Sequence, residues 1–222
     1  STAFAKAPLP WLSRVVNERK VEKALGETWL PLLPADRYRY EDDGVGEEGV
    51  EHWTPCFPHR LAATPGKADK AFFDAWVSSP FSDEALADLG MAAIDELKLG
   101  QGAGTDYLAI SFTALDAVGH DFGPRSHEVQ DVLARLDRTL GRLIGHLERR
   151  VPGRYVLALT ADHGVAPIPE QTAALGSGAG RLPGKELLST MEKTLEQLLG
   201  PGKHVVRMVG NDVILAPGVM EK

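Results

Sequence analysis

The chain has 222 residues, of which 43% are hydrophobic and 25% are charged, a composition that suits a globular protein with a sizeable core. The formal net charge is −7, and the 24 basic residues form no dense cluster, which argues against nucleic acid as a partner. No run of about eighteen apolar residues occurs, so no membrane span is predicted, and Cys56, the single cysteine, excludes an intramolecular disulfide.

The chain begins Ser1-Thr2-Ala3, without an initiator methionine and without the basic and apolar segments of a signal peptide. We therefore expect it to be an internal piece of a longer protein. The pattern predicts three parts: an irregular cap lobe over residues 1–78, an α/β core over 79–184, and a helix plus β-hairpin over 185–222.

The first part contains few regular elements. A helix is predicted within 11–25 and another over 71–77. Residues 52–59 are rich in aromatic residues and proline, and we favour a packed covering segment over a specific substrate contact. A further helix is expected between Ser82, its predicted N-cap, and Gly100.

The central part shows a strand, loop, helix, strand, loop pattern. The apolar runs 107–112 and 155–160 are short and rich in β-branched or aromatic residues, which predicts buried strands. Between them, apolar residues at three- and four-residue spacing predict a long amphipathic helix that starts after Ser126 and ends before Pro152. The pattern indicates an α/β fold, in which ligands bind at the carboxyl ends of the strands.

Aspartate and histidine follow both predicted strands. Asp116 and His120 lie on a predicted glycine-containing loop after the first strand, and Asp162 and His163 follow the second. Carboxylate and imidazole suit zinc, and two such pairs at neighbouring strand ends predict two metal ions that clamp the oxygens of an in-line displacement. The alternative makes Asp116 a turn cap and His163 a hydrogen-bonded core histidine, but four such residues at matching positions favour metal.

The remaining elements follow the metal-site region. Residues 171–184 are predicted to be loop, 185–199 a helix, and 204–208 with 212–216 a hairpin across Gly210-Asn211. Three titratable residues of the long helix, His127, Glu128 and Asp137, are predicted to be solvated or to lie behind the ligands, without contacting metal.

The motif Asp116-x-x-Gly119-His120-x-x-Gly123-Pro124, followed by Thr160-Ala161-Asp162-His163-Gly164, resembles the alkaline phosphatase superfamily. The likeness is with its type I phosphodiesterase and nucleotide pyrophosphatase branch, and most of all with bacterial phosphate-irrepressible alkaline phosphatases. It implies part of an alkaline-phosphatase-like central sheet flanked by helices. It also implies two Zn²⁺ ions, the first held by Asp116 and His120 and the second by Asp162 and His163.

By the same resemblance, the intact protein hydrolyses phosphate esters through a covalent phosphoryl-enzyme, in the periplasm or outside the cell. Monoesters are favoured, and diesters or nucleotide pyrophosphates are the alternative. No residue of this chain matches the family's nucleophile or its remaining ligands, since Thr2, Thr54 and His204 lie in unsuitable settings. We therefore expect the fragment to be inactive, to bind zinc weakly and to self-associate. A metal-free interaction module remains the alternative from a different class.

Overall fold

The computed structural model describes residues 7–18, 20–50, 52–61, 64–210 and 212–221. The chain folds as two compact units, Ser1–Gln171 and Thr172–Lys222. The division falls within the part expected as the α/β core, and the predicted domain boundaries at residues 78 and 184 stay a prediction. Thr2 and Asn211, named above as a rejected nucleophile and a turn residue, lie outside the described residues.

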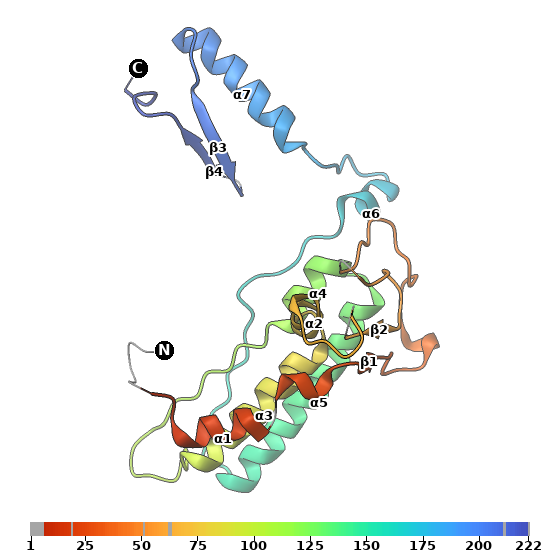
Figure 1. The fold of residues 1–222 in the computed structure, drawn as a ribbon, viewed down its shortest axis with the longest axis vertical. Helices are drawn as coiled ribbons and strands as arrows, with labels where there is room; N and C mark the ends of the chain where they lie inside the picture. Colours follow the sequence, from red (N-terminus) through yellow and green to blue (C-terminus); the bar gives the residue numbers. More distant parts are fainter. Residues whose placement is uncertain (1–6, 19, 51, 62–63, 211, 222) are drawn as a thin grey trace. The chain divides into compact units, whose positions relative to one another are not determined.

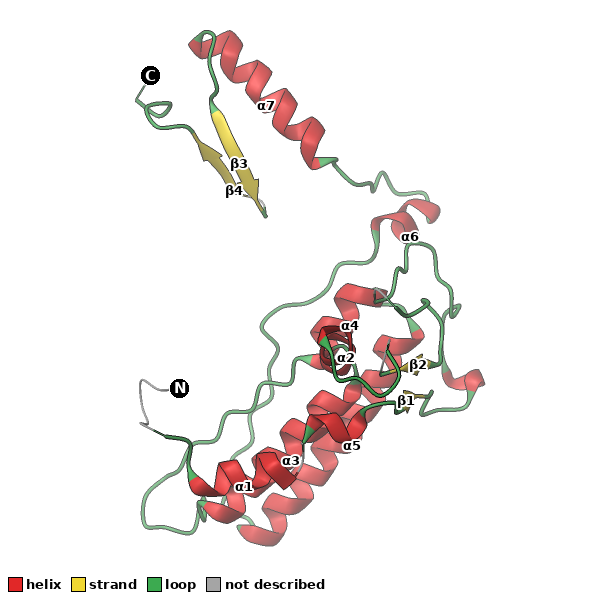
Figure 2. Ribbon diagram, in the orientation of Figure 1, coloured by secondary structure: helices red, strands yellow, loops and turns green. Residues whose placement is uncertain are grey.

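The first unit consists mainly of helices joined by long irregular segments (Figures 1 and 2). Two short strands pair antiparallel near its start. In chain order, its elements are α1 (Pro10–Glu18), the 3₁₀ turn η1 (Val21–Ala24), β1 (Thr28–Trp29), η2 (Ala35–Arg37), β2 (His59–Arg60), α2 (Lys70–Val77), α3 (Pro80–Glu96), α4 (Ala114–Phe122) and α5 (His127–Arg150). A short helix, α6 (Pro169–Ala174), crosses from this unit into the second.

The long helix α5 forms as predicted. The Ser126 hydroxyl accepts the backbone N–H of Val129 at 3.1 Å, which satisfies one of the donors that the start of a helix leaves open. Val129, Val132 and Leu143 are buried on its apolar face. Helix α3 packs along α5, and Figure 1 shows the two running side by side.

Two helix boundaries differ from the prediction. Helix α3 begins at Pro80 with Ser79 at the N-cap position, so Ser82 is not the cap. Proline at the first helical position explains this start, because its missing N–H needs no partner there. The Ser82 hydroxyl instead bonds the carbonyls of Val77 and Ser79. The predicted helix over 11–25 is also shorter, because α1 ends at Glu18 and a separate 3₁₀ turn follows.

The hydrophobic core joins the amino-terminal segment to helices α2, α4 and α5. Trp29 and Trp53 meet edge to face with ring centroids 6.1 Å apart, an arrangement that aromatic quadrupoles favour. Around them lie further buried residues from distant parts of the sequence: Leu61, Phe72, Ala75, Ala114, Val118, Phe122, Val129 and Val132. The aromatic and proline-rich residues 52–59 are therefore packed against the helices, as predicted.

The two central segments are not strands in this structure. Residues 107–112 and 155–160 are extended but pair with no other described segment. Their apolar side chains are largely exposed, including Tyr107 at 91% and Val156 at 98%, so in this chain the two predicted buried strands do not form. The physical reason is that a strand is defined by hydrogen bonds to a neighbour, and the described residues supply none here. Ile110 is partly buried and lies against Gly90 of α3.

The second unit contains the predicted helix and hairpin. Helix α7 (Gly184–Leu199) is followed by β3 (Val205–Val209) and β4 (Asp212–Leu215), which pair antiparallel. The Glu192 carboxylate of α7 accepts the backbone N–H groups of His204 and Val205 at 2.6 and 2.7 Å, and so fastens the start of β3 to the helix. Of the predicted loop 171–184, residues 171–174 are helical within α6, and Gly184 begins α7.

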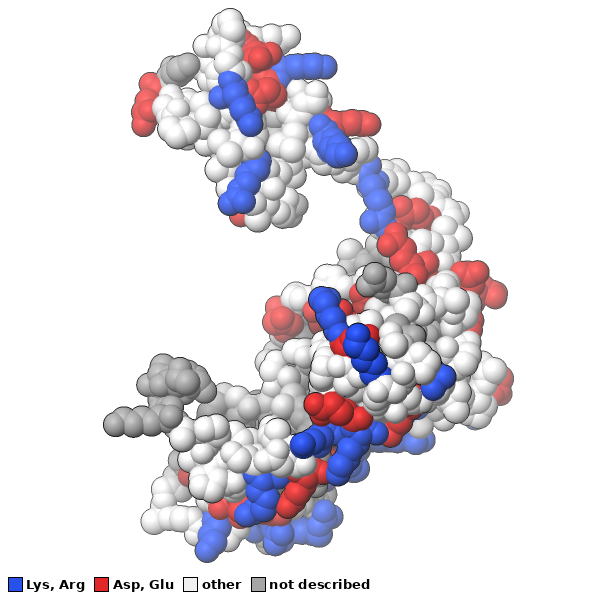
Figure 3. Space-filling view, viewed as in Figure 1, with Lys and Arg blue, Asp and Glu red and all other residues white. Residues whose placement is uncertain are grey.

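The face of the molecule seen in Figure 3 carries charges of both signs, interspersed with one another. Several charged side chains link helices of the first unit, such as Arg142 with Asp88 at 3.2 Å and Arg150 with Asp95 at 2.7 Å. Within the described residues, no helix is both long enough and apolar enough to cross a membrane.

Candidate metal centre

Asp116 and His120 lie on helix α4, and not on the loop that the sequence suggested. The helix is amphipathic: Ala114, Val118 and Phe122 are buried in the core, whereas Asp116 and His120 are exposed. Residues four apart share a helix face, which brings the Asp116 and His120 side chains together. Asp116 and His120 therefore remain a pair of neighbouring side chains, held by a helix and not by a loop.

Three of the four predicted ligands converge on one carboxylate. Asp116 Oδ1 lies 3.5 Å from His120 Nε2 and 3.6 Å from His163 Nε2. His163 comes from the extended segment that follows α5, so two distant parts of the sequence meet at Asp116. Asp162 is adjacent, with Oδ2 3.7 Å from His163 Nε2 and Oδ1 accepting the His163 backbone N–H at 3.1 Å.

These separations suit zinc donors. Two donors on a tetrahedral zinc at about 2.0–2.1 Å lie roughly 3.3 Å apart, close to the 3.5 Å between Asp116 Oδ1 and His120 Nε2 and to the 3.7 Å between Asp162 Oδ2 and His163 Nε2. The donor types, carboxylate oxygen and neutral imidazole nitrogen, also fit this ion. In the described part of the chain, however, no group of three or more His, Cys, Asp or Glu side chains is arranged to hold a metal. The arrangement is thus a partial donor set that needs further ligands.

The candidate residues are open to solvent, with the Asp162 side chain 89% exposed and the His120 side chain 75% exposed. The backbone nevertheless fixes the segment that follows them. Gly123, with φ of +90°, ends α4 so close to Ile168 that a Cβ at this glycine would lie 2.4 Å from Ile168 Cδ1. Buried Ile168 therefore anchors the chain beyond His163 against the end of the helix that carries Asp116.

The sequence analysis did not predict a buried contact between two ionisable residues, His59 and Glu128. His59 Nε2 and Glu128 Oε1 are 2.7 Å apart, and both side chains are fully buried. Burial raises the pKa of Glu128 to about 8 and lowers the pKa of His59 to about 4, because it penalises both charged forms. At neutral pH the protonated Glu128 carboxyl therefore donates to a neutral imidazole. Of the two settings predicted for Glu128, solvated or behind the ligands, the solvated one was wrong, because His59 of β2 covers this residue at the start of α5.

A second buried carboxylate, Asp131, ties residues 29–38 to α5. Its two oxygens accept from Trp29 Nε1, the Leu32 backbone N–H and the Tyr38 hydroxyl, each at 2.6 Å, and from Arg135 Nε at 2.7 Å. Burial, and after it the bond to Asp131, raises the pKa of Tyr38 to about 12. With four donors on two oxygens, this carboxylate has a structural role.

The other residues considered in the sequence analysis have partners other than the four candidate ligands. His127 bonds the Tyr40 carbonyl at 2.6 Å and lies 3.0 Å from Asp42 Oδ1. The Thr54 hydroxyl donates to the Cys56 carbonyl at 3.0 Å, and His204 Nε2 lies 2.8 Å from the Gly200 carbonyl within the second unit. Asp137 is exposed on α5.

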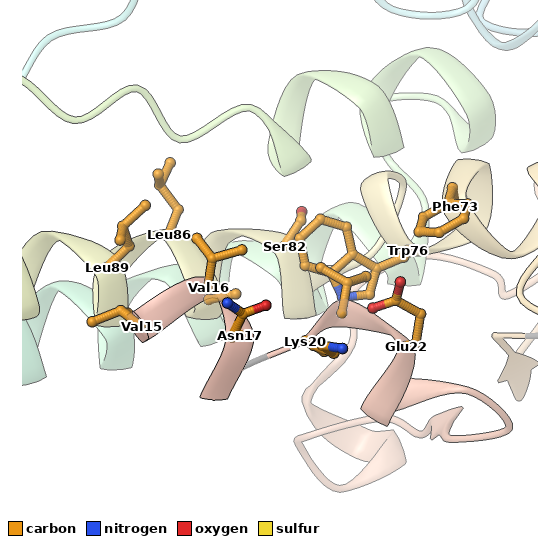
Figure 4. Close-up of a pocket in the computed structure, with 12 residues that line it drawn as sticks. Val15, Val16, Asn17, Lys20, Glu22, Phe73, Trp76, Ser82, Leu86 and Leu89 are labelled. Atoms are coloured by element: carbon orange, nitrogen blue, oxygen red, sulfur yellow. The ribbon is translucent and has the colours of Figure 1, made fainter. Parts of the chain in front are cut away.

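A cavity of about 520 Å³ lies among α1, α2 and α3, walled by apolar side chains such as Val15, Trp76 and Leu89 (Figure 4). None of the four candidate ligands lines it. Polar side chains, Asn17, Lys20 and Ser82 among them, also line it, but the cavity shares no residue with the candidate metal centre.

Comparison with known proteins identifies the family. The profile of the type I phosphodiesterase / nucleotide pyrophosphatase family matches residues 18–200. The chain belongs to this family. Its relatives include the alkaline phosphatases PafA of Elizabethkingia meningoseptica, 34% identical over 75% of this chain, and PhoV of Synechococcus elongatus, 30% identical over 90%. These matches place it in the alkaline phosphatase superfamily.

A crystal structure of wild-type PafA matches 99% of this chain with a TM-score of 0.83 at 29% identity. The likeness confirms the expected fold class, a partial α/β fold of the alkaline phosphatase type. The chain spans 31% of the length of the PafA relative, 35% of PhoV and 42% of the PafA crystal chain.

Proposed function

We propose that this chain is the part of a longer phosphate-ester hydrolase that supplies ligands to two zinc ions. Asp116 and His120 are assigned to the first ion, and Asp162 and His163 to the second. The observation that carries the proposal is that the two pairs lie side by side: Asp116 Oδ1 is 3.5 Å from His120 Nε2 of its own pair and 3.6 Å from His163 Nε2 of the other pair, as two neighbouring ions require. Family membership supports the same chemistry, because the relatives named above are alkaline phosphatases.

Zinc at these residues would neutralise charge on the attacking and leaving oxygens of a phosphate ester. The chain's own residues would hold and orient the ions. Helix α4 presents Asp116 and His120 from one rigid face, and His163 approaches from the segment anchored by Ile168. The nucleophile, and the covalent phosphoryl-enzyme it forms, are assigned to the rest of the longer protein. The exposed extended segments 107–112 and 155–160 are assigned to strands of its central sheet.

Phosphomonoesters are the favoured substrates because the relatives covering most of this chain are alkaline phosphatases. Diesters are the second candidate, because the matched family profile is named for phosphodiesterases. Comparing turnover of an aryl phosphate monoester and the corresponding diester by the longer protein separates the two. We place the protein in the periplasm or outside the cell, which fractionation of the source cells tests.

The decisive variants are Asp162→Ala and His163→Ala in the longer protein. Each should abolish turnover of an aryl phosphate and reduce bound zinc, while circular dichroism stays unchanged, because each removes one assigned ligand from an exposed position. Asp137→Ala, which removes an exposed carboxylate of α5, is the matched control and should keep wild-type activity. Near-wild-type turnover in either ligand variant would overturn the assignment. A wild-type protein that neither retains zinc nor turns over the ester would favour the interaction module.

A further inference from the structure

Helix α4 receives its amino-terminal cap from another helix. Thr113 occupies the N-cap position, but its side chain makes no capping hydrogen bond. Instead Asp83 Oδ1 of α3 accepts the backbone N–H of Thr113 at 3.1 Å and that of Ala114 at 3.2 Å. One carboxylate oxygen thus satisfies two of the donors that the start of a helix leaves open.

Burying the Asp83 carboxylate at this position is energetically unfavourable. The residue is only 4% exposed, and its Oδ2 finds no hydrogen-bond partner among the described residues. A buried carboxylate with an unsatisfied oxygen opposes folding, and burial raises the pKa of Asp83 accordingly. The hydrogen bonds from two backbone N–H groups and the positive end of the α4 helix dipole stabilise the carboxylate and offset this unfavourable burial.

The capped end of α4 is also the end nearest Asp116. Asp116 lies in the first turn of this nine-residue helix, and His120 lies one turn later. The far end is fixed where Gly123 meets Ile168. A helix this short is directed by its two ends, so the bond to Asp83 sets the direction in which both candidate ligands project.

We propose that Asp83 is a positioning residue that holds the first turn of α4, and thereby Asp116 and His120, in the orientation that binds metal. This inference rests on the proposed zinc site. A cap that only stabilised the fold would leave metal affinity untouched once the protein is folded. The two roles therefore differ in what their loss does to zinc binding.

The first arm measures amide hydrogen exchange in the 222-residue chain. In Asp83→Ala, protection of the Thr113, Ala114 and Ala117 amides should fall about tenfold, because the cap is lost. Asp83→Asn keeps an oxygen acceptor and should stay within about threefold of wild type. The control is Asp95→Ala, which removes an α3–α5 link to His146 and Arg150 without touching α4. Unchanged protection in Asp83→Ala overturns the inference.

The second arm measures zinc affinity of the longer protein by competition with a chelating dye, on variants that circular dichroism shows to be folded. Asp83→Ala should bind zinc about tenfold more weakly, and Asp83→Asn should restore affinity to within about threefold, in line with the loss and rescue of the cap. Wild-type affinity in Asp83→Ala, or an equal loss in Asp95→Ala, overturns the positioning role. If the wild-type protein binds no zinc, the proposed function fails instead, and the exchange arm still shows whether Asp83 holds α4.

Discussion

Replacing Glu128 with glutamine should remove most of the alkaline loss of stability of the first unit. Glu128 keeps its proton to a pKa of about 8 in the folded chain, against an ordinary value of 4.5, so its contribution is complete below pH 4.5 and disappears as the pH rises through 8. His59 has the opposite sign: its pKa falls from 6.5 to about 4, so its contribution is present above pH 6.5 and is lost as the pH falls through 4.

Between pH 4.5 and 6.5, His59 and Glu128 together bind one proton in the folded state and one in the unfolded state, and stability is highest there. Above pH 6.5 the unfolded pair releases that proton while the folded pair keeps it. One proton over the roughly 1.5 pH units up to pH 8 corresponds to a loss of about 2 kcal/mol. Glutamine keeps an N–H donor for His59 Nε2 but has no proton to lose, so the variant should not show this loss.

The assay is urea unfolding at pH 6.5 and pH 8, followed by tryptophan fluorescence. All four tryptophans lie in the first unit, and the indoles of Trp29 and Trp53 are close to the His59 ring. Wild type should lose about 2 kcal/mol of unfolding free energy between the two pH values, and Glu128→Gln should lose little. Asp137→Asn, which changes an exposed carboxylate of the same helix, should follow wild type. Parallel losses in wild type and Glu128→Gln would refute the assignment of a neutral buried pair.

Two further predictions concern metal binding and folding. Calorimetric titration of the 222-residue chain with zinc should show only weak binding, because each assigned ion has two ligands here where a stable zinc site has three or four; tight binding of two ions per chain would contradict this. Asp131→Ala should lower the unfolding free energy by about 3–5 kcal/mol, because it leaves the Trp29 indole and the Tyr38 hydroxyl buried without their acceptor. Asp137→Ala should stay within about 0.5 kcal/mol of wild type, and equal urea midpoints for the two variants would refute the role of Asp131.

Local signals in the sequence predicted the long helices α5 and α7. The Ser126 cap and the apolar periodicity after it specify α5, because both act within a few residues of the chain. The same holds for α7 and for the hairpin after it. Proline at position 80 is also a local signal, and it marks the true start of α3 better than Ser82 does.

Features that depend on distant residues were not predictable from local patterns. Runs 107–112 and 155–160 have the composition of strands, but pairing requires neighbours that the pattern of one segment does not supply. Glu128 was expected to be solvated or to lie behind the ligands because only its polarity is visible in the sequence, whereas His59, which covers it, lies 69 residues away. For Asp116 and His120, the residue types and their spacing were informative. Gly119 suggested a loop, but burial of the Val118 and Phe122 side chains favours a helix at these residues.

The most direct test of the zinc assignment is a crystal structure of the longer protein grown with zinc, with anomalous difference maps recorded at the zinc absorption edge. We expect two peaks, one within about 2.2 Å of donor atoms of Asp116 and His120 and the other within the same distance of Asp162 and His163. A map without zinc peaks at these side chains, or with a peak bonded to His127, Glu128 or Asp137, would contradict the proposed metal centre.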